Sequence, residues 1–192
     1  MSVIPFGRES DLQAAIEAWF SRIGLPFDAQ RKTRSGRCDL ALYNDQARLQ
    51  SPWCVLEIKN GLNPRTTKLA ELADYFEQCV KYQLTTRLPV FLGPVFIPTM
   101  GIDWCMQGGV TPPTSVAAFS AYAGRVNVGL FFVNAPSGRE SDPAAWRGFR
   151  MTMRQQTVAR WHEAESSYVW PESHIDLMSF DRAPSASIRT AA

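Results

Sequence analysis

Glu57 and Lys59 place a carboxylate and an ammonium two positions apart, at the end of the apolar stretch PWCVLEIKNG, residues 52–61. The large apolar side chains before them predict a buried strand. Residues two apart in a strand share a face, so both charges point one way and Ile58 points the other way, into the core. Since a Glu-x-Lys triplet occurs by chance about once in 225 residues, other residues must decide whether it does chemistry.

Asp39 supplies a second carboxylate, in the stretch GRCDLAL of the preceding predicted strand. If the strands at 37–43 and 53–59 are adjacent and antiparallel, Asp39 and Glu57 converge. With the Ile58 carbonyl and water they would form an all-oxygen site suited to Mg²⁺ or Mn²⁺. Such an ion helps to generate hydroxide and neutralises charge on a phosphate, while Lys59 would orient the water or stabilise the transition state. The ordinary alternative is an exposed strand-end ion pair worth well under about 1 kcal/mol, with the two carboxylates far apart.

The elements before this strand are predicted from periodicity and turn residues. The segment SDLQAAIEAWFSRIG predicts a helix, with Ser10 and Gln13 as a capping box and Gly24 as its end. Two β-like stretches follow, at 26–32 and 37–43, and TRSG between them predicts a hairpin turn. The apolar face of the helix consists of Leu12, Ile16, Trp19, Phe20 and Ile23.

The elements after it complete an α-β-β-β-α-β order. A second helix is predicted within 66–86, capped by Thr66 or Thr67, and the apolar run at 88–98 predicts a buried strand. This order predicts one α/β domain with a mixed central sheet flanked by helices. The apolar face of the second helix is predicted to consist of Leu69, Leu72, Phe76, Val80 and Leu84.

Beyond residue 98 the prediction is coarser. A Gly- and Pro-rich loop is expected at 98–114, then a short helix, a fifth strand ending at 134, and a helix start with Asp142 as cap and Pro143 first. The segment FRMTMRQQTVARWHE fits either strand or helix. We therefore expect a core over 1–134, a C-terminal extension packed on it over 135–182, and a disordered tail over 183–192.

The order of elements and the motifs GRCDLAL and CVLEIKNG resemble the PD-(D/E)xK nuclease superfamily over residues 9–97. Cys38 stands where the family usually has proline. The resemblance implies a restriction-endonuclease-like αβββαβ core with C-terminal additions, a divalent metal and phosphodiester hydrolysis. It implies that Asp39 and Glu57, with Ile58, hold the metal and that Lys59 is the catalytic lysine.

Further site residues come from the two helices. The superfamily often adds a glutamate from the first helix, and Glu9 and Glu17 are the two choices. The opening ESDLQAAIEAWF resembles the virus-type replication–repair nuclease branch, and Glu9 is favoured because it falls within the arc of the helix's apolar face. Gln78 and Tyr82 resemble the Q-x-x-x-Y element of exonuclease-like members, but a solvated helix face is the simpler interpretation. Gln83 is another polar group expected near the site.

Basic residues precede Asp39 closely. Lys and Arg side chains in a hairpin there would meet the phosphates of nucleic acid, and Arg65 and Lys68 would add to them; a solvated turn is the alternative. A second set, Arg147, Arg150, Arg154 and Arg160, alternates with Trp146, Phe149 and Trp161, and we interpret these aromatics as core. His162 and His174 lack partners for a metal site. The residues of the first basic set are Arg31, Lys32, Arg34 and Arg37.

Composition leaves the function class open, but it gives no indication of a membrane span, a signal peptide, a zinc site or a disulfide framework. Net charge is +2 and the pI is about 8.4, no run of residues suits a membrane span, and the N-terminus lacks signal-peptide features, so a cytoplasmic location is expected. The cysteines Cys38, Cys54, Cys79 and Cys105 indicate neither zinc nor disulfides. The sequence predicts a Mg²⁺- or Mn²⁺-dependent deoxyribonuclease without an organic cofactor, and a homodimer if both strands are cut. A catalytically silent nucleic-acid-binding or protein-interaction module remains the alternative, and the substrate form, RNA included, is open.

Overall fold

The computed structural model describes residues 5–33, 36–43, 52–63, 67–97, 114–154, 156–165 and 167–169. They form a mixed α/β fold, which confirms the predicted class, and within them no helix has the length and apolar character needed to cross a bilayer. The helices are α1 (Glu9–Ile23), α2 (Leu69–Thr86), α4 (Thr114–Arg125) and the 3₁₀ turn η3 (Pro143–Ala145). The strands are β1 (Phe27–Ala29), β2 (Lys32–Thr33), β3 (Gly36–Arg37), β4 (Leu40–Leu42), β5 (Cys54–Ile58), β6 (Val90–Ile97), β7 (Gly129–Asn134), β8 (Gly148–Met153), β9 (Gln156–His162) and β10 (Ser167–Val169).

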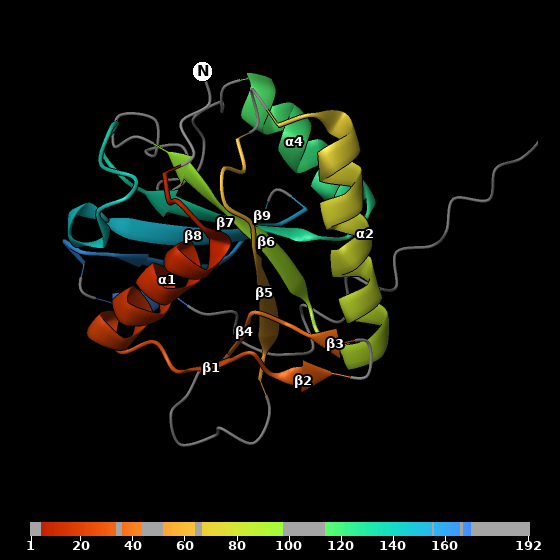
Figure 1. Ribbon diagram of the computed structural model, residues 1–192, viewed down its shortest axis with the longest axis horizontal. Helices are drawn as coiled ribbons and strands as arrows, with labels where there is room; N and C mark the ends of the chain where they lie inside the picture. The colour runs from red at the N-terminus through yellow and green to blue at the C-terminus, as the bar shows by residue number, and fades with distance from the viewer. Residues whose placement is uncertain are drawn as a thin grey trace, which may run out of the picture.

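One eight-stranded sheet runs through the molecule in the order β1-β4-β5-β6-β7-β8-β9-β10, and β2 and β3 form a separate hairpin (Figure 1). The pairs β5–β6 and β6–β7 are parallel, and the other pairs are antiparallel. The predicted antiparallel pairing of the two motif strands is confirmed, with Leu40 opposite Leu56. Strands β8 to β10 continue the same sheet beyond β7.

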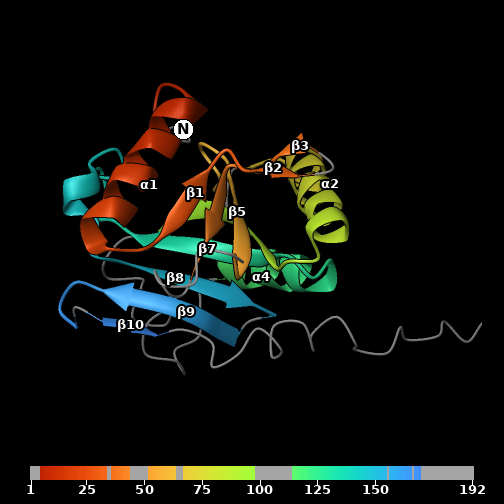
Figure 2. The ribbon, with the colours of Figure 1, turned by 90° about the horizontal axis from the view of Figure 1, so that it is seen from below.

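Helices cover both faces of this sheet, and α1 and α2 lie on opposite sides of β5 in both views (Figures 1 and 2). Each large apolar side chain buried between a helix and the sheet stabilises the fold by roughly 1.5–3 kcal/mol. The α1-side core includes Leu12, Ile16, Trp19, Phe20, Leu40, Leu42, Cys54, Leu56, Ile58, Phe91, Phe131, Val133 and Phe149. The α2-side core includes Cys38, Ala41, Val55, Leu72, Phe76, Cys79, Tyr82, Val90, Leu92, Val95, Phe119, Leu130 and Phe132.

Alternation along β5 decides where the charged residues emerge. Leu56 and Ile58 belong to the α1-side core, and Val55 belongs to the α2-side core. Because successive side chains point to opposite faces, Glu57 and Lys59 emerge on the side of α2. Ile58 points into the core as predicted.

The first helix has the predicted apolar face, but its N-terminus differs from the prediction. The residue before it is Arg8, with no side-chain cap, so the expected Ser10–Gln13 capping box is absent; Glu9 and Asp11 in the first turn complement the helix dipole instead. Gly24 ends the helix in the left-handed conformation, at φ 78°, as predicted.

The two predicted strands at 26–32 and 37–43 are each divided in two. Gln30 has a φ of 51°, which ends β1, and its N–H donates to the carbonyl of Asp39 at 2.8 Å. The hairpin predicted around TRSG is present as β2 and β3, with Lys32 opposite Arg37. The division leaves Asp39 at the bend where the chain passes from the small hairpin into the main sheet.

The second helix packs with the predicted face in part: Leu72 and Phe76 are buried and Val80 is partly buried, but Leu84 is not. Leu84 is 76% exposed, whereas Cys79 and Tyr82 are buried beside Leu72 and Phe76. The three- and four-residue steps through these four residues form the stripe that meets the sheet, and Leu84 falls outside it. Lys68, not a threonine, precedes the helix; the Thr67 hydroxyl accepts a hydrogen bond from the N–H of Asn63.

The later elements follow the predictions in outline. The helix after the Gly- and Pro-rich segment is α4, the fifth strand is β7, and the Asp142 carboxylate caps η3 by accepting from Ala144 N–H at 3.0 Å. The ambiguous segment at 149–163 forms the antiparallel pair β8–β9. Residues 98–113 and the tail at 183–192 lie outside the described residues.

Candidate active site

Glu57 and Lys59 form a buried ion pair at the carboxyl end of β5. The Lys59 Nζ lies 2.8 Å from Glu57 Oε1, and the side chains are 12% and 1% exposed. An exposed strand-end pair, the ordinary interpretation of this triplet, is therefore wrong. Two charges removed from water in this way need further partners to offset the cost of desolvation.

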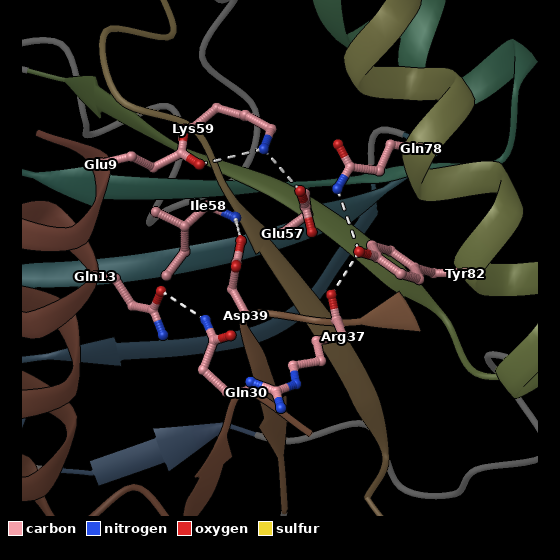
Figure 3. A network of polar contacts seen from close by, with 10 residues as sticks. All are labelled: Glu9, Gln13, Gln30, Arg37, Asp39, Glu57, Ile58, Lys59, Gln78 and Tyr82. Carbon is pink, nitrogen blue, oxygen red and sulfur yellow. Dashed lines mark hydrogen bonds and ion pairs between the residues drawn. The ribbon is translucent and has the colours of Figure 1, made fainter. Parts of the chain in front are cut away.

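Asp39 lies directly against the end of β5 (Figure 3). Its Oδ2 accepts a hydrogen bond from the backbone N–H of Ile58 at 2.7 Å. Continuing the β4–β5 register by one residue from Leu40 and Leu56 brings Asp39 level with Glu57. The two carboxylates from GRCDLAL and CVLEIKNG thus come together at neighbouring strand positions.

The pKa values of both carboxyl groups are raised at this position. Burial, then the charge of Asp39, raises the pKa of Glu57 to about 7, although Lys59 opposes the shift. Burial also raises the pKa of Asp39, while the hydrogen bond from Ile58 and the charge of Lys59 lower it in part. Two neighbouring carboxyl groups whose pKa values are both raised by burial form a site that a cation would stabilise.

The donor set fits a hard divalent cation. Glu57 Oε2 is buried and receives no hydrogen bond, so it is free to serve as a ligand oxygen. Within the described ranges no group of three or more His, Cys, Asp or Glu side chains is arranged to hold a metal ion. Magnesium sites in proteins commonly use one or two carboxylates and complete their shell with water and substrate oxygens.

Lys59 is held by groups from both helices. Glu9 Oε1, at the start of α1, lies 3.4 Å from its Nζ, and the Tyr75 ring of α2 has its centroid 5.7 Å away. Burial favours the neutral amine, but Glu57, Glu9 and Asp39 outweigh it and raise the pKa of Lys59 above its ordinary value. Lys59 is therefore protonated at neutral pH.

Glu9 rather than Glu17 lies at the site. Glu17 accepts a hydrogen bond from Gln13 Nε2 at 2.8 Å, whereas Glu9 is paired with Lys59. The geometry of α1 thus separates the two alternatives that helical spacing left open.

Gln78 and Tyr82 connect α2 to β3, which ends two residues before Asp39. The Tyr82 hydroxyl donates to the Arg37 carbonyl at 2.6 Å and accepts from Gln78 Nε2 at 3.2 Å (Figure 3). Tyr82 is 6% exposed, so the solvated face expected there is wrong for this residue. Gln83 donates to the Asn127 carbonyl and so contacts the turn before β7 instead of the site.

The basic residues expected to bind nucleic acid divide into two kinds. Arg31 interacts with other residues of the protein: its guanidinium donates to the Tyr43 hydroxyl and lies 3.6 Å from the Asp28 carboxylate. Lys32 and Arg37 on the β2–β3 hairpin and Lys68 before α2 are exposed. Arg34 and Arg65 lie outside the described residues.

The second set of aromatics belongs to the core, as interpreted from the sequence. Trp146 and Phe149 are buried, and Trp161 packs on Trp19 with ring centroids 5.9 Å apart. The neighbouring arginines lie along β8 and β9, where Arg147 pairs with Glu163 and Arg160 with Glu165. His162 Nδ1 accepts from the Ala164 N–H, and His174 lies outside the described part of the chain.

Sequence reasoning missed three contributors to the site. Asn60 donates to the Phe6 carbonyl at 2.6 Å, which ties the segment before α1 to the end of β5 and brings Glu9 near Lys59. Gln30 Nε2 donates to Gln13 Oε1 at 3.1 Å and links α1 to the turn beside Asp39. Tyr75 is the third. Spacing gave no signal for these contacts, because each joins segments far apart in the chain.

Comparison with known proteins gives no match: no family model, curated protein or solved structure matches this chain. The functional argument therefore rests on the geometry of the site.

Proposed function

We propose that this protein is a Mg²⁺-dependent nuclease that hydrolyses phosphodiester bonds in DNA, built on a restriction-endonuclease-like core of the PD-(D/E)xK type. One observation carries the proposal: Asp39, at the bend before β4, and Glu57, on β5, converge beside Lys59, and a buried oxygen of Glu57 is without a hydrogen bond. The order of elements from α1 to β6 supports the same core.

Asp39 and Glu57, with the Ile58 carbonyl, would hold the divalent ion. When bound, the ion supplies a hydroxide from coordinated water and neutralises charge on the phosphate. The hydrogen bond from Ile58 N–H fixes the carboxylate of Asp39, and the rigid, buried β5 fixes that of Glu57.

Lys59 would act by charge and hydrogen bonding. Its raised pKa keeps the ammonium protonated at neutral pH, so it does not serve as a general base. It can donate to a phosphate oxygen or to the attacking water and stabilise the charge that develops in the transition state. Glu9 and Glu57 hold the ammonium in place until substrate arrives.

The exposed cations of the β2–β3 hairpin would guide DNA to this site. The hydrogen bond from Tyr82 to Arg37 holds the hairpin beside α2, on the face where Glu57 and Lys59 emerge. Lysine and arginine contacts to phosphates supply most sequence-independent affinity for DNA. Because one site cuts one strand, cleavage of both strands would require a homodimer or two binding events.

The test is a panel of duplex, single-stranded, nicked and branched DNA and of RNA, incubated with Mg²⁺ or Mn²⁺ and with chelator. We expect cleavage of at least one DNA form that stops on chelation. Binding that weakens steeply with salt, without cleavage of any member, would favour the catalytically silent binding module instead.

A further inference from the structure

Asn60 directly follows Lys59, and the proposed catalysis gives it no part. Its Nδ2 donates a hydrogen bond to the backbone carbonyl of Phe6 at 2.6 Å, although the two residues are 54 positions apart. Its Oδ1 is buried and receives no hydrogen bond within the part of the chain that the structure describes. Among these residues the side chain is therefore held through its donor end, by the segment that leads into α1.

Phe6 is anchored at a second point by its ring. The ring meets the Trp146 ring edge-on, with centroids 6.4 Å apart, and packs against the α1-side core. The carbonyl of Phe6 is thus bound to the end of β5 while its side chain is bound to the core. Glu9 follows three residues later as the first residue of α1. Because three residues span at most about 11 Å, this anchor also limits where Glu9 can lie.

Glu9 needs such an anchor because its own contact with Lys59 is weak. Its carboxylate lies 3.4 Å from Lys59 Nζ and its side chain is 49% exposed, whereas Glu57 lies at 2.8 Å and is 1% exposed. An ion pair with a solvent-exposed partner contributes little free energy, because it must offset the entropy lost in ordering its side chains. The position of the Glu9 backbone therefore decides whether this contact forms.

The Lys59 ammonium has three N–H donors, and its contacts with the two glutamates direct two of them. Figure 3 shows Glu9 and Glu57 reaching Nζ from different directions. With two donors fixed, the direction of the third is fixed as well, and this donor is left for a phosphate oxygen or the attacking water. Without Glu9, the ammonium would keep its contact with Glu57 but could turn about it.

Resting on the proposed function, we infer that Asn60 is a positioning residue for Lys59. Its hydrogen bond to Phe6 places Glu9, and Glu9 directs the ammonium toward the phosphate or the attacking water. In this arrangement Glu9 serves the lysine and not the metal ion. The role requires a side-chain donor at position 60, since the Phe6 carbonyl can only accept. Misplacing a reacting group by about 1 Å can slow a reaction by about 100-fold, so a small shift of the ammonium suffices.

The experiment compares the wild type with Asn60→Leu, which keeps the shape of the side chain and removes its donor, Asn60→Ala, Glu9→Ala, and the double variant of Asn60→Leu with Glu9→Ala. Arg22→Ala is the matched control, because Arg22 donates to the Pro143 carbonyl at 2.9 Å and so ties down the other end of α1. The measurements are kcat and KM on the best DNA substrate, Mg²⁺ affinity by calorimetry, and the NMR resonance of Lys59 Nζ in chelator, assigned by its loss in Lys59→Met.

We expect Asn60→Leu, Asn60→Ala and Glu9→Ala each to lower kcat by about 10- to 100-fold, with KM and Mg²⁺ affinity unchanged. The double variant should lose no more than Glu9→Ala alone, because Asn60 acts through Glu9 and the two losses are then not additive. In chelator, the Lys59 Nζ resonance should shift in each of these variants. Arg22→Ala should match the wild type in every measurement.

Three results would overturn the inference while leaving the nuclease intact. The first is a wild-type kcat for Asn60→Leu and Asn60→Ala, and the second is a double variant whose loss equals the product of the two single losses. The third is weak Mg²⁺ binding by Glu9→Ala with an unmoved Lys59 resonance, which would mean that Glu9 serves the ion. If the wild type cleaves no substrate, the proposed function fails. The Lys59 resonance in chelator then decides whether Asn60 positions the ammonium, and an unmoved resonance in Asn60→Leu would overturn this.

Discussion

Mg²⁺ should bind this protein about tenfold more tightly at pH 8 than at pH 6, because Glu57 must lose its proton to become a ligand. The pKa of Glu57 is raised to about 7 by burial and by Asp39. With that pKa about one-tenth of the carboxyl groups are ionised at pH 6 and about nine-tenths at pH 8. The raised pKa of Asp39 acts in the same direction at lower pH.

Isothermal titration calorimetry in buffers of different ionisation enthalpy measures both the affinity and the protons released. About 0.9 proton should leave per ion bound at pH 6 and about 0.1 at pH 8. Glu57→Gln should bind Mg²⁺ weakly and without this pH dependence, whereas Glu77→Gln, which changes an exposed carboxylate paired with Lys81, should keep it. Equal affinity at both pH values for the wild type would refute the assignment of Glu57 as a buried metal ligand.

Three further predictions concern the support of the site. Tyr82→Phe removes the hydroxyl that donates to the Arg37 carbonyl, so it should lower the free energy of unfolding in urea by about 1 kcal/mol and weaken Mg²⁺ binding. An unchanged Mg²⁺ affinity would mean that Tyr82 contributes to stability and not to the site. Gly93→Ala should destabilise the protein by about 1–3 kcal/mol or more in thermal unfolding, because its Cβ would lie 2.5 Å from the Phe131 carbonyl oxygen; a wild-type melting curve would contradict this packing. With a chelator present, the free energy of unfolding, measured in urea, should be highest below pH 4.5, where Glu57 is protonated in both states. It should fall by on the order of 3 kcal/mol as the pH rises through 7, because burial of the ionised carboxylate is unfavourable. A free energy of unfolding that is independent of pH across this range would contradict the raised pKa.

The main features of the site were predictable because they depend on strand geometry. The two-residue period of β5 fixes Glu57 and Lys59 on one face, and the antiparallel partner strand brings Asp39 beside them. Both relations follow from the alternation of side chains along β5 and from its pairing with β4. The meeting of these two carboxylates is therefore predictable from the sequence.

The features that sequence reasoning missed depend on long-range hydrogen bonds. Hydrophobicity favoured Leu84 for the buried face of α2, but Tyr82 is buried instead because its hydroxyl reaches the Arg37 carbonyl, 45 residues earlier in the chain. Arg31 likewise looked free to bind phosphate, yet it is held by Tyr43, the residue directly after β4. Periodicity describes which face of an element is apolar and carries no information on such partners.

The most direct test of the proposed nuclease is the Mg²⁺-dependent cleavage rate of the best DNA substrate by Lys59→Met, with Lys81→Met as an exposed-lysine control. Lys59→Met should still bind Mg²⁺, since Asp39 and Glu57 remain, but should cleave about 100- to 1000-fold more slowly than the wild type. Lys81→Met should cleave normally. Cleavage by Lys59→Met at the wild-type rate would contradict the account, because the ammonium between Glu57 and Glu9 would then have no part in the reaction.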